Sequence, residues 1–241
     1  MDEPLRIIGQ PEADDDNTAV PFAIEDWLTA PPDRQTLLIG ANESAAAARI
    51  DQFVENISRH GPIGAEVLHL PGDPLTLPYE SGRFDLAICA FLSAEAEINN
   101  ETVAEISRVI RPGGRLLIID NLVPGSRLRG KKARQLRLAG EWVNAWVRLR
   151  NPQHKRYLSQ DAWTCLLRDG QWNFQQMASG ETAQDFDTWA DHYSPSANNR
   201  IRLQAMLLQA PEKVHRFLTP QESGDRIAFR MTKVFILTTK T

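Results

Sequence analysis

EISRVIRPGGRLLIID, residues 105–120, is the stretch that decides the fold. Its first part continues a helical pattern in which Val103, Ile106 and Ile110 share one face, and Pro112-Gly113-Gly114 is expected to end that helix. Its last part, residues 114–120, is a short apolar run of the kind found in strands buried on both faces. The stretch therefore predicts a helix that leads through a tight turn into a buried strand.

Further apolar runs precede this stretch, and each of them predicts a buried strand. They cover residues 36–40, 65–70 and 84–90. Between the first two, residues 46–57 have apolar side chains at spacings of three and four, which predicts an amphipathic helix that Gly61-Pro62 ends. Strands that alternate with amphipathic helices indicate βαβ units, and hence a parallel sheet with right-handed crossovers.

The pattern changes after Asp120. A long helix is predicted, with Trp142 and Trp146 on its inward face, and packing is favoured over ligand stacking for this pair. The helices expected in this half cover residues 126–149, 159–169, 184–192 and 196–218. Two late β-like runs, 172–177 and 229–238, are expected to join the edge of the same sheet, with helices inserted before the last strand.

Composition bounds the class of protein. The chain has 241 residues and a net charge of −4, from 27 basic and 31 acidic side chains. We expect an acidic flexible leader over 1–19 and a single domain over 20–241, with helical cap segments at about 121–170 and 180–220. No apolar run approaches the roughly 20 residues that span a bilayer, so a cytoplasmic location is expected. Cys89 and Cys165 have no metal-ligand spacing, and no metal site is predicted.

Two segments carry a resemblance to a known family. LPYESGRFD (residues 77–85), followed by the stretch at 105–120, resembles the "LPF…FD" and "E…RVLKPGG" signatures of class I S-adenosylmethionine-dependent methyltransferases. Residues 148–154 and 158–163 also resemble the segment after strand five in the quinone and small-molecule subgroup. The resemblance implies an α/β, doubly wound, Rossmann-like sheet that is mostly parallel, with late edge strands, S-adenosylmethionine as cofactor and a small-molecule acceptor.

The same resemblance implies where the site residues lie. The cofactor is expected at the carboxyl ends of the strands, and Asp73 matches a family aspartate that accepts a hydrogen bond from the adenine amino group. Two catalytic candidates follow. Glu95 stands where family members often carry a His-His pair, and is either a base or a solvated carboxylate; His154 matches a position near the mouth of the site. The cofactor-binding positions implied are Gly40, Ala41, Asn42, Asp73, Pro74, Leu75 and Ala90.

The first motif departs from the family pattern. Family members carry a glycine-rich "D-x-G-x-G-x-G" turn, whereas Leu37–Ser44 keeps only Gly40, and Glu43 adds negative charge where the methionine moiety is expected. About 47 residues separate the first strand from Phe84-Asp85, roughly one β-α unit fewer than the family uses. The missing unit would contain the carboxylate that holds the ribose. Cofactor binding is therefore expected to be weak or lost.

Two functions remain open from the sequence. The first is methyl transfer to an unidentified small-molecule acceptor. The alternative is a catalytically inactive methyltransferase-like subunit that acts in the assembly or regulation of a partner, which leaves a homo-oligomer or a protein complex open. A basic run at residues 127–137 could attract an anionic substrate, acidic lipid or nucleic acid, but a solvated helix face is favoured, and the net negative charge disfavours nucleic acid.

Overall fold

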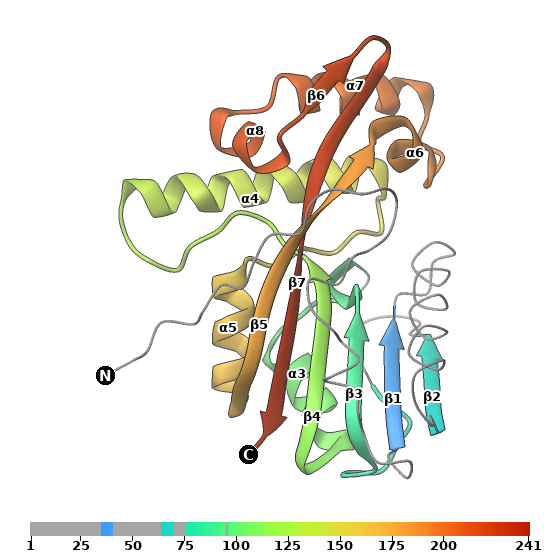
Figure 1. Ribbon diagram of the computed structural model, residues 1–241, viewed down its shortest axis with the longest axis vertical. Coiled ribbons are helices and arrows are strands. Elements are labelled where there is room, and N and C mark those ends of the chain that lie inside the picture. The colour runs from blue at the N-terminus through green and yellow to red at the C-terminus, as the bar shows by residue number, and fades with distance from the viewer. Residues whose placement is uncertain (1–34, 41–63, 70–75, 95) are drawn as a thin grey trace.

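The computed structural model of the chain describes residues 35–40, 64–69, 76–94 and 96–241, and one sheet runs through it (Figure 1). The sheet order is β2-β1-β3-β4-β7-β5, with the short β6 paired to β7. The predicted leader and the predicted helix at 46–57 lie outside the described residues. None of the helices described is both long enough and apolar enough to cross a membrane.

Four strands form the parallel part of the sheet, as the apolar runs predict. They are β1 (Gln35–Gly40), β2 (Gly64–His69), β3 (Phe84–Ala90) and β4 (Ile110–Asn121). β1 pairs in parallel with both β2 and β3, and β3 pairs in parallel with β4. Leu37 is fully buried and its neighbour Leu38 is also buried, so β1 is covered on both faces. This explains why the run is apolar throughout rather than alternating.

One boundary in this region was predicted wrongly. Ile110, expected on the face of the preceding helix, is the first residue of β4, because α3 (Asn100–Val109) ends one residue earlier. Pro112-Gly113-Gly114 lies within the first part of β4 instead of closing the helix, and Gly113 adopts a left-handed φ of 73° there. An apolar residue at a helix–strand junction fits both patterns, so the spacing alone could not place it.

Two long strands complete the sheet in antiparallel pairing. β7 (Arg226–Lys240) lies between β4 and β5 (Trp172–Asp185), and β6 (Gln221–Ser223) pairs with the start of β7. Both long strands were predicted, but β5 continues well beyond its predicted run at 172–177, β7 is a few residues longer than predicted at both ends, and only β5 lies at the edge of the sheet. The extensions carry β5 and β7 past the parallel strands and over α4 (Figure 1). Exposed residues alternate with half-buried ones in the β5 extension and with buried ones at the start of β7, so these parts lack the continuous apolar run used to find the strands.

The helices divide between the sheet and the region above it in Figure 1. α3 and α5 (Gln160–Asp169) pack beside the sheet, and side chains at their N-caps, Asn99 and Ser159, accept hydrogen bonds from backbone N–H groups of the first turn. The long α4 and the three helices between β5 and β7 form the upper part. Its elements are α4 (Lys131–Arg150), α6 (Phe186–Asp191), α7 (Ala197–Leu208) and α8 (Glu212–Leu218).

The upper helices have a hydrophobic core of their own. Trp146 is fully buried there and stacks on Trp189, with ring centroids 4.2 Å apart. Phe229 of β7 meets the Trp146 ring edge-on, and the Trp146 Nε1–H donates to the Leu203 carbonyl at 3.0 Å. The expected inward packing of Trp146 is confirmed, whereas Trp142 is half-buried. Strand β7 therefore contributes to the core of the sheet and to the core of the upper helices.

Candidate functional site

The order of the strands reverses at the carboxyl ends of β1 and β3. From β1 the chain passes to β2 on one side and then returns to β3 on the other side of β1. This reversal is the topological switch point at which ligands bind in open α/β sheets. Gly40 and Ala90, the last residues of β1 and β3, are register partners there, and both are buried. These two predicted cofactor positions are brought together by the fold.

The chain turns sharply after β3. Phe91 has a positive φ of 55°, a conformation that costs a non-glycine residue about 1 kcal/mol or more. Its N–H donates to the Ile119 carbonyl at 2.7 Å, so the turn remains tied to β4. A short 3₁₀ helix, η1 (Leu92–Ala94), follows directly. The turn therefore leads the chain across the carboxyl end of β4, next to the switch point.

A buried carboxylate holds this turn in place. Asp120, fully buried near the end of β4, accepts hydrogen bonds from the Ser93 N–H at 3.0 Å and the Ser93 Oγ–H at 2.7 Å. It also accepts one from the Asn121 N–H at 2.7 Å. Burial raises the pKa of Asp120 to about 6, against the lowering effect of these hydrogen bonds. Sequence reasoning used Asp120 only as the end of a strand; an acidic residue ending an apolar run was the signal that was missed.

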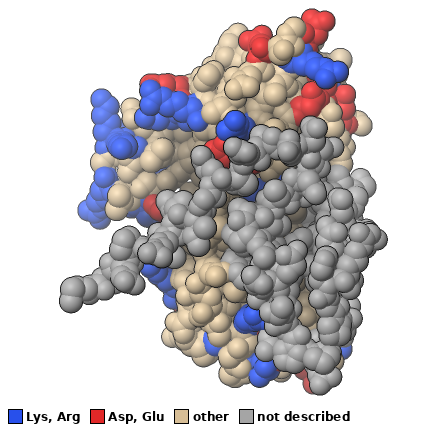
Figure 2. Space-filling model, viewed as in Figure 1, with Lys and Arg blue, Asp and Glu red and all other residues tan. Residues whose placement is uncertain are grey.

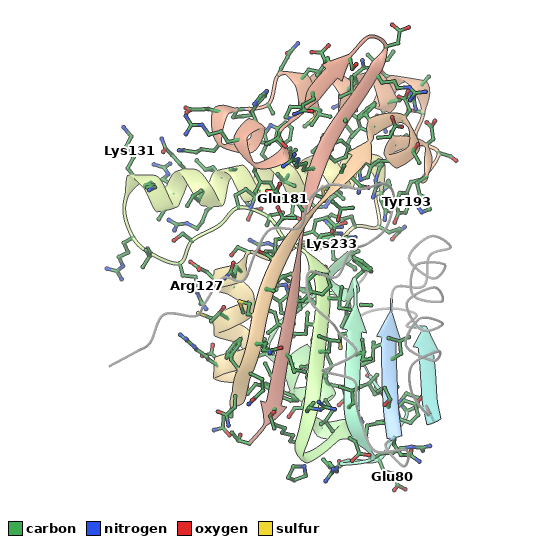
Figure 3. All side chains as sticks on the ribbon, viewed as in Figure 1. Glu80, Arg127, Lys131, Glu181, Tyr193 and Lys233 are labelled. Carbon is green, nitrogen blue, oxygen red and sulfur yellow. The ribbon has the colours of Figure 1, made fainter. Side chains whose placement is uncertain are left out.

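A cation lies at the same level of the sheet. Lys233 of β7 is buried and lies next to Asn121 in the β4–β7 pairing (Figure 3). Its ammonium group lies 5.7 Å from the centre of the Phe91 ring, within reach of a cation–π interaction. The carboxyl ends of β3 and β4 therefore carry a buried acid, a hydroxyl and an amine within one small region. In the described part of the chain, no cluster of His, Cys, Asp and Glu could hold a metal ion.

His154 lies beside this region, in the segment after α4. Asn144 of α4 pairs with the backbone of Tyr157: its Oδ1 accepts from the Tyr157 N–H at 2.7 Å, and its Nδ2 donates to the Tyr157 carbonyl at 3.1 Å. This pairing fixes the orientation of the amide. The Nε2 atom of His154, 3.0 Å from the same Oδ1, must therefore carry the hydrogen and donate it. The ring of His154 is thus part of a buried network that joins α4 to the following segment.

The environment of His154 favours its neutral form. Burial first, and then the positive charges of Arg148 and Arg150, lower its pKa to about 3. A group with so low a pKa is a weak proton acceptor near neutral pH, so these contacts favour a structural role. The segment does approach the predicted site, because the N–H groups of Lys155 and Arg156 donate to the carbonyls of Ala94 and Ser93 at 3.0 and 3.1 Å. The catalytic role of His154 stays a prediction.

The remaining predicted site residues lie outside the described residues. Glu95 directly follows Ala94, whose carbonyl meets the His154 segment. The others follow β1 and β2 in the sequence, and these strands are described up to Gly40 and His69. They are Ala41, Asn42, Asp73, Pro74 and Leu75, and their roles stay predictions.

The sheet order and its switch point are those of α/β proteins in which a ligand binds across the carboxyl ends of parallel strands. Residues 41–118 match the family described as a methyltransferase domain. The uncharacterized methyltransferase YcgJ of Bacillus subtilis is 23% identical over 167 residues, which cover 68% of this chain and 62% of that protein. A demethylmenaquinone methyltransferase of Deinococcus radiodurans is 41% identical over 59 residues, 24% of each chain.

Solved structures share the fold. The crystal structure of YcgJ superposes with a TM-score of 0.70 at 17% identity, covering 90% of this chain and 96% of that one. A putative methyltransferase from Bacillus halodurans gives a TM-score of 0.71 at 16% identity, with the same coverage. By sequence, the chain spans 62% and 50% of the first two curated relatives that it matches. The match over residues 41–118 and the shared fold agree with the methyltransferase resemblance found in the sequence.

Proposed function

We propose that the chain transfers a methyl group from S-adenosylmethionine to a small-molecule acceptor. The observation that carries this proposal is the switch point, where Gly40 and Ala90 end adjacent strands in register. Neither residue has a side chain larger than a methyl group, so a ligand can approach the backbone closely at this point. The residues present at the switch point therefore fit a nucleoside cofactor of the family.

The residues have distinct roles in this proposal. Gly40, Ala41 and Asn42 face the methionine part of the cofactor, Ala90 borders the switch point, and the loop Asp73–Leu75 holds the adenine. The cofactor supplies an electrophilic methyl group, so the protein mainly orients the acceptor and excludes water. Glu95 accepts the acceptor's proton if burial raises its pKa. Asp120 is a positioning residue, because its hydrogen bonds to Ser93 fix the turn that leads to Glu95.

We further propose that the cofactor binds weakly. The first motif, Leu37–Ser44, has one glycine instead of three, and Glu43 repels the methionine carboxylate. In the described part of the chain, β2 pairs directly with β1 and no strand lies beyond it, which fits the loss of the unit that holds the ribose. The expected Kd is above about 100 μM, less than roughly 5.5 kcal/mol of binding free energy.

The alternative, a catalytically inactive subunit that serves a partner or a homo-oligomer, differs in one measurable property. It requires that cofactor binding be lost, whereas the enzyme requires that it survive. None of the comparisons supports the inactive subunit. A cytoplasmic location suits either function and is proposed with them.

Calorimetric titration of the purified chain with S-adenosylmethionine and S-adenosylhomocysteine tests the proposal. Binding in the range of hundreds of micromolar is expected, and Asp73→Asn should weaken it by about 1–2 kcal/mol, the cost of degrading one hydrogen bond to a charged group. Asp169→Asn, at an exposed position at the end of α5, is the matched control and should bind like the wild type. Low-micromolar binding would refute the weak site, and no binding at millimolar cofactor would favour the inactive subunit.

A further inference from the structure

The segment from Arg127 to Leu138, here called the basic-leucine surface, is the most positively charged part of the described chain. It covers the loop before α4 and the first two turns of that helix, and six of its twelve residues are Lys or Arg, with no Asp or Glu. Figure 2 shows these cations gathered at the outer end of α4, at the left of the view. Lys131 projects away from the body of the protein there, whereas Arg127 lies nearer to α5 (Figure 3).

Folding does not account for the two lysines of this surface. Lys131 and Lys132 occupy the first turn of α4, which has no acidic residue, although a helix N-terminus favours carboxylates and disfavours cations. Neither lysine forms an ion pair with a described carboxylate, whereas exposed arginines elsewhere, such as Arg216 and Arg230, do. The lysines thus reduce the stability of the helix that carries them, which points to a role outside folding.

Two exposed leucines lie among the cations. Leu128 is 74% exposed and Leu138 is 58% exposed. Within the described residues only one other large apolar side chain, Ile201, is exposed, so most of the strongly exposed apolar side chains gather in this one segment. The loop is held to the helix, because one Nη of Arg137 donates to the carbonyls of Ser126 and Leu128 at 2.8 and 2.9 Å. Leu128 is therefore presented by an ordered loop.

The stripe of α4 that carries Leu138 also carries a tryptophan further along the helix. Trp142 follows Leu138 by four residues and lies on the same stripe. With Arg202 and Met206 of α7 it lines a surface groove of 340 Å³. Leucine, methionine and tryptophan side chains bordered by Arg and Lys have the composition of helices that lie in the interface of a bilayer.

We propose that the basic-leucine surface docks on an anionic lipid bilayer. The cations face the lipid headgroups, at about 1 kcal/mol for each Lys or Arg near an anionic surface, and Leu128 and Leu138 enter the boundary between headgroups and acyl chains. A nucleic acid would satisfy the cations, but it would leave the two leucines exposed to phosphate and water. Such docking is peripheral and needs no membrane-spanning helix. It is independent of the cofactor and of methyl transfer.

Co-sedimentation of the full chain with vesicles tests this proposal at about 0.1 M salt. Wild type should bind vesicles of phosphatidylcholine mixed with phosphatidylglycerol and should not bind phosphatidylcholine alone. Lys131→Glu with Lys132→Glu should lower the partition coefficient by at least about 25-fold, or about fivefold for each cation removed. The matched control, Arg168→Glu with Arg226→Glu, makes the same change in net charge at exposed positions elsewhere and should bind like the wild type.

A second pair of variants tests the leucines. Leu128→Ser with Leu138→Ser should weaken vesicle binding about tenfold, while Ile201→Ser on α7 should leave it unchanged. Equal binding to both kinds of vesicle, or equal losses in the lysine pair and its control, would overturn the proposal. Binding to a DNA duplex, measured in parallel, would also overturn the proposal if it required the two lysines and the protein did not bind vesicles.

Discussion

Replacing His154 by Gln should make the fold less sensitive to acid. The folded-state pKa of His154 is about 3, below the ordinary value of 6.5. A group whose pKa is lowered by folding contributes stability above its unfolded pKa, and this contribution is lost as the pH falls toward the folded pKa. Protons bound by the unfolded chain below about pH 6.5 therefore favour unfolding.

The size of the effect follows from this pKa. Between about pH 6.5 and pH 5 the unfolded His154 becomes charged while the folded one stays neutral, a span of about 1.5 pKa units at about 1.36 kcal/mol each. The wild type should therefore lose about 2 kcal/mol more than His154→Gln over this interval. Gln can still donate to the Asn144 Oδ1, so at neutral pH the variant should lose only the edge-on ring contact with Tyr157, about 1 kcal/mol.

Urea unfolding near pH 7 and near pH 5, followed by far-ultraviolet circular dichroism, measures the difference. His215→Gln is the matched control, because His215 is exposed on α8 and the substitution leaves the buried network intact. This control should keep the acid sensitivity of the wild type. If wild type and His154→Gln lost equal stability over the interval, the neutral, buried state assigned to His154 would be refuted.

Two further predictions concern single residues. Burial raises the folded-state pKa of Asp120 to about 6 from 3.8. The stability that its protonation contributes is therefore fully present below about pH 3.8 and is lost as the pH rises through 6. Between pH 7 and pH 5, the free energy of unfolding of wild type, measured by urea unfolding, should rise by about 1 kcal/mol relative to that of Asp120→Asn. Gly140→Ala on α4 would push a methyl group into the Pro124 carbonyl; overpacking of about 3 kcal/mol should outweigh the gain of about 1 kcal/mol in helix propensity, and thermal unfolding at or above the wild-type temperature would contradict this.

The parallel sheet could be predicted because burial on both faces leaves an apolar run in the sequence. β1 and β3 were placed from such runs to within one residue at either end. The sequence was less informative about strand segments that are covered on only one face. The extensions of β5 and β7 alternate in exposure, and neither could be found from continuous apolar stretches. Ile110 shows a third case, since an apolar residue between a helix and a strand satisfies both patterns.

The site could be predicted where it follows from topology. Gly40 and Ala90 were expected to bind the cofactor at the carboxyl ends of strands; the structure places them as register partners on adjacent strands, and their cofactor role stays a prediction. The link between Ser93 and Asp120 was missed, because the two residues are 27 positions apart and no local spacing joins them. The environment of His154 was missed for the same reason, since its partner Asn144 is an ordinary polar residue on α4 until the chain folds back.

The position of β7 has a consequence for synthesis. It is the last strand in chain order, yet it lies inside the sheet, between β4 and β5. While the ribosome extends the chain, the backbone N–H and C=O groups along the outer side of β4 have no strand partner until residues 226–240 have emerged. An unpaired strand edge of this kind, bordered by apolar side chains, can pair with strands of other nascent chains. The second half of the sheet therefore assembles late, and translation that stalls before Arg226 leaves an aggregation-prone product.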